Sequence, residues 1–119
     1  MKEPVIICEG PLDADVFESI QAAVRYIEPV DVADGIFTGY DSEGRLLEIF
    51  LTDPTKPLYG RDINITIKDA EKVPSHQGEL ICVLRHFLKS VQKKPVSDKQ
   101  VDAMSLAELV DEALKYKTD

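Results

Sequence analysis

Residues 36–51 read IFTGYDSEGRLLEIFL, and this stretch decides the fold. Two apolar runs, 36–40 and 45–51, flank the four residues from Asp41 to Gly44. An Asp suits the start of a type I turn, and a Gly supplies the positive φ that lets the two strands resume pairing. The stretch therefore predicts a β-hairpin over residues 36–51.

Two further segments have the character of strands. Residues 62–68 alternate between apolar and polar side chains, which predicts a strand with Ile63, Ile65 and Ile67 facing inward. A strand with one polar face implies an antiparallel partner. Residues 5–8 form a short apolar run that predicts a strand buried on both faces, while the pattern of residues 11–18 stays ambiguous between loop and strand.

Three segments carry the apolar spacing of helices, namely 19–28, 75–93 and 105–117. A short helical turn is expected near residues 98–103. Capping residues support the starts of these helices: Ser75 is the expected N-cap of the longest one, and two Ser-x-x-Gln/Glu patterns match capping boxes, Ser97 with Gln100 and Ser105 with Glu108.

These elements predict an α+β fold in a single domain spanning residues 1–119. An antiparallel sheet of the hairpin 36–51, strand 62–68 and strand 5–8 is expected to pack against the three helices on one face. Helix 75–93 has the widest apolar stripe. We therefore expect Leu84 and Leu88 to be buried against Ile63, Ile65 or Ile67.

Composition bounds the class of protein. The 119 residues are 44% hydrophobic and 30% charged, which is a globular balance. No apolar run approaches the roughly 20 residues that a membrane span requires, and the N-terminus does not resemble an export signal. A cytoplasmic location without membrane contact is expected, with Cys8 and Cys82 as free, buried thiols.

Charge is distributed unevenly along the chain. Residues 1–44 contain ten acidic side chains and two basic ones, so they carry the whole net charge of −8. An acidic half repels nucleic acid and attracts a basic partner or a cation. For any single acidic residue, the simpler interpretation is a surface that keeps the protein soluble.

The segment from Glu9 to Asp13, Glu-Gly-x-x-Asp after an apolar strand, resembles the first motif of Toprim domains. The resemblance implies a Glu9 that acts as general acid or base beside Mg²⁺, with Asp13 as a further acidic residue. That family also has an Asp-x-Asp after a second apolar strand, and this sequence has none in such a place. An antiparallel sheet also differs from the parallel sheet of that family.

Other catalytic or cofactor patterns are weak. Cys82 and His86 are spaced i, i+4 on one helix, as two zinc ligands can be, but no third ligand stands at a recognisable spacing. The sequence has no nucleophile elbow and no phosphate-binding glycine loop. We therefore expect no catalytic residue, no metal and no cofactor.

Several stretches resemble a group of small bacterial proteins, some of them similar to immunity proteins of polymorphic toxin systems. The residues that carry this resemblance are structural ones, in caps, a turn and an apolar stripe: 15–19, 23–29, 30–32, 40–47 and 106–110. The resemblance implies a compact protein that neutralises a toxin by binding it. It carries over no binding residue.

The sequence thus favours a non-enzymatic interaction protein that binds a basic protein partner, such as a toxin, through its acidic half. The residues expected to meet that partner, with Tyr side chains as anchors, are Asp31, Asp34, Asp41, Glu43, Tyr40 and Tyr59. The alternatives are a Toprim-like, metal-dependent nucleic-acid enzyme built on Glu9 and Asp13, and a homo-oligomeric structural protein.

Overall fold

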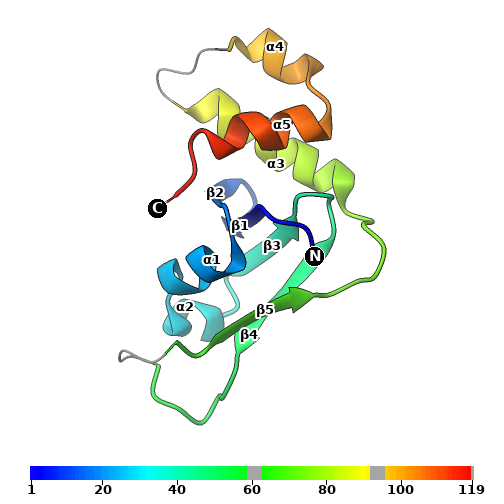
Figure 1. Ribbon diagram of the computed structural model, residues 1–119. Coiled ribbons are helices and arrows are strands. Elements are labelled where there is room, and N and C mark those ends of the chain that lie inside the picture. Colours follow the sequence, from blue (N-terminus) through cyan, green and yellow to red (C-terminus); the bar gives the residue numbers. More distant parts are fainter. Residues whose placement is uncertain (59–62, 92–95, 119) are drawn as a thin grey trace.

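The computed structural model describes residues 1–58, 63–91 and 96–118 (Figure 1). Its five strands form one sheet in the order β2-β1-β3-β4-β5, and every neighbouring pair is antiparallel. The strands are β1 Val5–Glu9, β2 Asp13–Phe17, β3 Phe37–Asp41, β4 Leu46–Leu51 and β5 Ile65–Asp69. The helices are α1 Ile20–Tyr26, α2 Pro29–Ala33, α3 Gln77–Ser90, α4 Asp98–Ala103 and α5 Leu106–Leu114.

The α+β class and the hairpin predicted over residues 36–51 are confirmed. Strands β3 and β4 pair with Gly39 opposite Leu47 and Tyr40 opposite Leu46. Gly44 ends the turn with a φ of 88°, the left-handed region that glycine adopts without strain. The hairpin is therefore built by the turn chemistry that the sequence indicated.

Strand β2 resolves the ambiguity of residues 11–18. It pairs with β1 over five residue pairs, from Val5 opposite Phe17 to Glu9 opposite Asp13. Because β3 pairs with the other side of β1, the first strand of the chain lies inside the sheet. The segment containing Glu9 and Asp13 is accordingly the tip of a β-hairpin.

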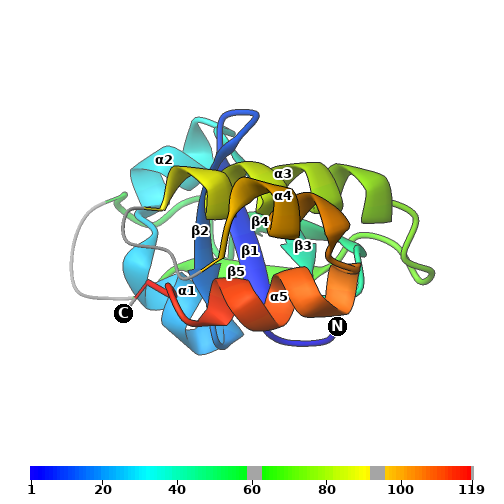
Figure 2. The ribbon, with the colours of Figure 1, turned by 90° about the horizontal axis from the view of Figure 1, so that it is seen from above.

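Helices cover both faces of the sheet, so the expectation that they share one face is wrong. Ile6 and Cys8 of β1 face a core formed with α3, α4 and α5, whereas Val5 and Ile7 face a second core formed with α1 and α2. Strand β1 is thus buried on both faces, as its continuous apolar run predicted. Figure 2 shows α3, α4 and α5 stacked over one side of the strands.

The predicted contact between α3 and β5 is also wrong. Ile65 and Ile67 are each 7% exposed and pack in the core of α1 and α2, while Leu84 and Leu88 are fully buried in the opposite core. Ile63 lies ahead of β5 and is 58% exposed, because the strand begins only at Ile65 although the alternating pattern starts earlier.

Helix starts follow the capping residues with one exception. The side chains of Ser19, Ser97 and Ser105 cap α1, α4 and α5, and the last two form complete capping boxes. Helix α3 has His76 and not Ser75 at its N-cap, because the Ser75 hydroxyl donates a hydrogen bond to Glu71 instead. Pro29 begins α2, because the fixed φ of proline suits the first position of a helix.

The outer edge of β2 is covered by the C-terminal segment. The backbone N–H of Thr118 donates to the carbonyl oxygen of Val16 at 2.8 Å, and its hydroxyl donates to Asp15 at 3.0 Å. In the parts of the chain that the structure describes, none of the helices combines the length and apolar character that a membrane span needs.

Candidate functional site

Acidic side chains gather where the β1–β2 hairpin meets the connection between α2 and β3. Gly10 in the hairpin turn donates its backbone N–H to the carbonyl oxygen of Ile36, so these two segments are neighbours (Figure 2). Glu9 and Asp13 stand directly opposite each other in the hairpin, and Asp34 precedes Ile36 by two residues. Each of these three carboxylates is exposed.

Asp31, also predicted to bind a partner, lies in the first turn of α2 and is half-buried. Together with Glu9, Asp13 and Asp34 it defines what we call the acidic tip. Residues 9–13 and 31–36 contain no Lys or Arg. Among the described residues, no ion pair or side-chain hydrogen bond involves any of these four carboxylates, although those of most other acidic residues do have such partners.

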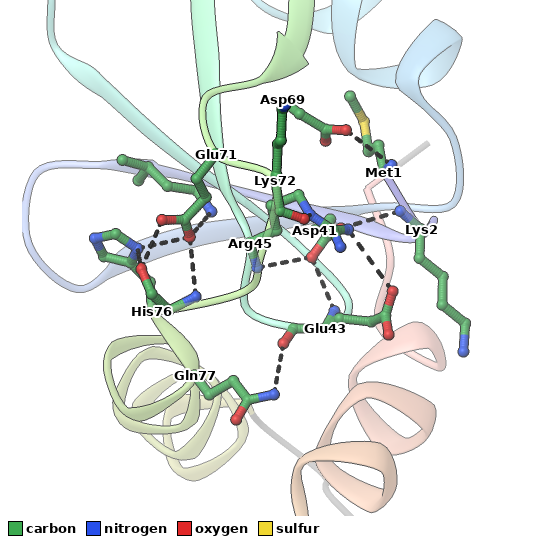
Figure 3. Close-up of polar contacts among 12 residues, drawn as sticks. Met1, Lys2, Asp41, Glu43, Arg45, Asp69, Glu71, Lys72, His76 and Gln77 are labelled. Atoms are coloured by element: carbon green, nitrogen blue, oxygen red, sulfur yellow. Dashed lines mark hydrogen bonds and ion pairs between the residues drawn. The ribbon is translucent and has the colours of Figure 1, made fainter.

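Asp41 does not belong to an exposed binding face, contrary to the expectation from the sequence. Its side chain is 0% exposed. One carboxylate oxygen accepts the backbone N–H groups of Glu43 and Arg45 at 2.9 and 2.8 Å, and the other accepts the N–H of Lys2 and the Arg45 guanidinium at 3.0 and 2.7 Å (Figure 3). The carboxylate therefore holds the turn and the N-terminal segment together.

Two opposing influences act on the Asp41 carboxylate. Burial by itself raises its pKa, because the charged form loses hydration. The hydrogen bonds from Arg45, Lys2 and Glu43 stabilise the charged form, and together they leave the pKa below its ordinary value. Asp41 is thus a structural anion with its charge already balanced inside the fold.

Tyr40 is 6% exposed, so the expectation of an exposed aromatic anchor is also wrong. Its ring packs in the core of α3, α4 and α5, and its hydroxyl donates to Glu79 of α3 at 3.0 Å. Burial, and after it the contact with Glu79, raises the pKa of Tyr40. The second aromatic anchor expected from the sequence, Tyr59, lies outside the described residues.

Glu43 is exposed but is not free for a partner. Its carboxylate lies 3.7 Å from the guanidinium of Arg45, and its carbonyl oxygen accepts a hydrogen bond from the Gln77 side chain at 3.0 Å (Figure 3). The turn is docked further by the backbone N–H of His76, which donates to the carbonyl oxygen of Gly44. Glu43 therefore belongs to the contact between the hairpin turn and α3.

A second carboxylate cluster, which the sequence did not reveal, centres on Glu71. One of its oxygens accepts the N–H groups of Leu46 and Ser75 and contacts Nδ1 of His76, and the other accepts the Ser75 hydroxyl at 2.6 Å (Figure 3). The Ser75 hydroxyl, followed by the Leu46 N–H and His76, lowers the pKa of Glu71 to about 2, and Glu71 raises that of His76.

The Glu71 cluster has a structural purpose. Its Ser, His and Glu come from one short loop, and the Ser75 hydroxyl is committed to Glu71. The cluster joins the start of β4 to the loop before α3. The only sequence signal was the closeness of Glu71 to Ser75 and His76, and a spacing of four or five residues in a loop is too common to be informative.

The cysteines and histidines do not assemble into a metal site. Cys8 is buried and Cys82 is exposed on α3, so the expectation that both thiols are buried holds only for Cys8. Burial raises the pKa of Cys8 to about 11, with Asp13 and Asp15 adding to the shift. Within the described ranges, no group of three His, Cys, Asp or Glu side chains is arranged to hold a metal ion.

Comparison of the chain with protein-family models, with curated proteins and with solved structures gave no match. Of the acidic residues indicated by the sequence, Asp34 lies close in the chain to Ile36, which contacts the Glu9–Asp13 hairpin, and Asp31 lies in the preceding helix α2. Asp41 and Glu43 belong to the turn that docks on α3.

Proposed function

We propose that this protein is a non-enzymatic, immunity-like interaction protein that binds a basic protein partner through the acidic tip. The observation that carries the proposal is that the carboxylates of Glu9, Asp13, Asp31 and Asp34 have no ion-pair or hydrogen-bond partner among the described residues, while those of Asp41 and Glu43 do. Charges that the fold does not neutralise remain available to an incoming cationic surface.

The arrangement of Glu9 and Asp13 supports this proposal. Like charges directly opposite each other across two strands are unfavourable for the sheet. A basic side chain that approaches the tip relieves this repulsion, so binding gains an electrostatic contribution that the free protein lacks. A basic nuclease is the kind of toxin that suits such a surface, because its own active site attracts phosphate.

The experiment captures basic proteins from the native host with this protein as bait and then measures their association rates with it, at low and at high salt. We expect the double variant Asp13→Lys/Asp34→Lys to associate about tenfold more slowly at low salt, since electrostatic steering acts mainly on the association rate. The salt dependence should also weaken in that variant. Asp111→Lys is the matched control, because Asp111 is an exposed acid on α5, away from the tip.

Two outcomes contradict the proposal. One is an equal slowing by Asp111→Lys and by a single Asp34→Lys, which would mean that only net charge matters. The other is Mg²⁺-dependent cleavage of DNA or RNA by the free protein that Glu9→Ala abolishes. That second result would replace the interaction protein with the Toprim-like enzyme built on Glu9 and Asp13.

A further inference from the structure

Strand β5 ends the sheet on the side opposite to β2, and half of its backbone groups point away from the sheet. Ala70 donates its N–H to Leu46, and Thr52 donates its N–H to Asn64. In an antiparallel pair the hydrogen-bonded residues alternate, so the even-numbered residues of this strand bond to β4. The N–H and C=O groups of Ile65, Ile67 and Asp69 therefore face outward.

The two edge strands of the sheet differ in whether another segment bonds to their outer backbone groups. The C-terminal segment covers the β2 edge through Thr118, whereas no described segment forms a backbone hydrogen bond to the outer edge of β5. Strand β5 contains neither Pro nor Gly and alternates between apolar and polar residues from Ile65 to Lys68. Such an edge is a template for another strand.

Exposed apolar side chains stand at both ends of β5. Ile63, just before the strand, is 58% exposed, and Val73, shortly after it, is 72% exposed; they are the two highest values among the exposed large apolar side chains of the described residues. An antiparallel partner strand brings its end beside the start of β5. If that partner is a second copy, Ile63 of one chain and Val73 of the partner subunit lie toward the same end of the paired strands.

Charge also favours a second copy at this edge. The chain carries −8 overall, yet the charges near β5 are balanced: Lys68 lies 3.8 Å from Glu48, and the N-terminal amino group lies 3.0 Å from Asp69. Glu9 and Asp13 of the acidic tip belong to β1 and β2, at the far end of the strand order, and an antiparallel β5 pair would point the tip ends of the two sheets in opposite directions. Two copies can therefore meet through β5 without bringing their acidic tips together.

We propose that β5 pairs antiparallel with β5 of a second copy, so that the two sheets join into one across a twofold axis. The outward N–H and C=O groups of one strand must face the outward C=O and N–H groups of the other. We therefore place Thr66 opposite Thr66 of the partner subunit, with Ile65 opposite Ile67 of the partner subunit. This register keeps Lys68 away from the partner's Lys68, which a pairing centred on Ile67 would place on a short diagonal. Because the β2 edge is covered, assembly stops at a dimer.

The test uses charge at the twofold axis. Thr66 lies on the polar face of β5, so Thr66→Asp or Thr66→Lys sets two like charges opposite each other only in the dimer. Analytical ultracentrifugation of the wild type should show a monomer–dimer equilibrium. Each variant alone should weaken the dimer about threefold to tenfold, and an equimolar mixture of the two should restore it.

The matched control is Thr38→Lys, which adds a charge on the same face of the sheet but on β3, and it should leave the dimer unchanged. Hydrogen exchange adds a measurement without any variant. The amides of Ile65 and Ile67 should become protected as the concentration of wild-type protein rises. A monomer at every concentration, exchange at these amides that does not respond to concentration, or a mixture no tighter than either variant would overturn the proposal.

Discussion

Two turns of this molecule have similar composition and different purposes. The turn of the β1–β2 hairpin runs from Glu9 to Asp13, and the turn of the β3–β4 hairpin runs from Asp41 to Arg45. Each has two or more acidic residues and a glycine with positive φ, Gly10 at 79° and Gly44 at 88°. The first is exposed, while the second is docked on α3 through the backbone of Gly44.

The difference lies in what surrounds each carboxylate. Asp41 accepts hydrogen bonds from three backbone N–H groups and from the Arg45 guanidinium, so the fold uses its charge. Glu9 and Asp13 face each other without such donors among the described residues. An acidic turn is therefore a sign of binding only where the fold leaves its charge unsatisfied, and the sequence does not show which turn that is.

The largest expected effect is the difference in unfolding free energy between a substitution in one turn and a substitution in the other. Asp41→Ala removes the acceptor of four donors and leaves the Arg45 guanidinium without its shortest partner, so it should cost about 3–5 kcal/mol of unfolding free energy. Asp13→Ala should change that free energy by less than about 0.5 kcal/mol. Urea titrations measure both. Equal losses in the two variants would mean that the turns do not differ in this way.

The second comparison uses the glycines of the two turns. A Cβ atom on Gly44 would lie 2.6 Å from Cγ and 2.7 Å from Cα of Gln77, whereas a Cβ on Gly10 meets nothing within 4 Å. Gly10→Ala should cost about 1–2 kcal/mol for the left-handed backbone alone. Gly44→Ala adds steric crowding against α3, so its cost should be about 2–4 kcal/mol. Thermal unfolding measures both losses. If the two variants lost equal stability, the turn at Gly44 would not be packed against α3.

Much of the fold could be predicted because local chemistry determined it. The turn at 41–44 and the capping boxes of α4 and α5 act within a few residues, so the sequence showed them directly. Strand β2 was not recognised, because Asp13-Ala-Asp has poor strand propensity and its first residues are polar. Pairing with the buried strand β1 overrides that local preference.

The site was harder to predict because its decisive contacts are distant in the chain. Asp41 is buried by the N-terminal segment, which contacts it through Lys2, thirty-nine residues away. Tyr40 is covered by α3, which it reaches through Glu79. In the sequence alone, both residues fit the pattern of an exposed turn. Likewise, nothing in the sequence places Asp34 beside the Glu9–Asp13 hairpin, which depends on the contact of Gly10 with Ile36.

The smallest expected effect is on how the unfolding free energy declines at low pH. Hydrogen bonds hold the pKa of Asp41 below its ordinary value, and the pKa of Glu71 is about 2. A carboxylate whose pKa is lower in the folded than in the unfolded protein adds stability above the unfolded pKa of roughly 4, and this stability disappears as pH falls through the folded pKa. The unfolding free energy should therefore decline below about pH 4.5 and continue to fall towards pH 2.

Asp41→Asn keeps the shape of the side chain and removes its charge, so its stability should decline less steeply between about pH 4.5 and pH 2 than that of the wild type. Glu71 still titrates in that variant, so part of the slope should remain. Asp13→Asn is the matched control, because it also removes one carboxylate charge, but from a side chain that accepts no hydrogen bond within the described residues. Denaturant titrations at several pH values measure the slopes. If Asp13→Asn flattened the acid decline as much as Asp41→Asn does, the charge at the acidic tip would be part of the fold and would no longer be available to a partner.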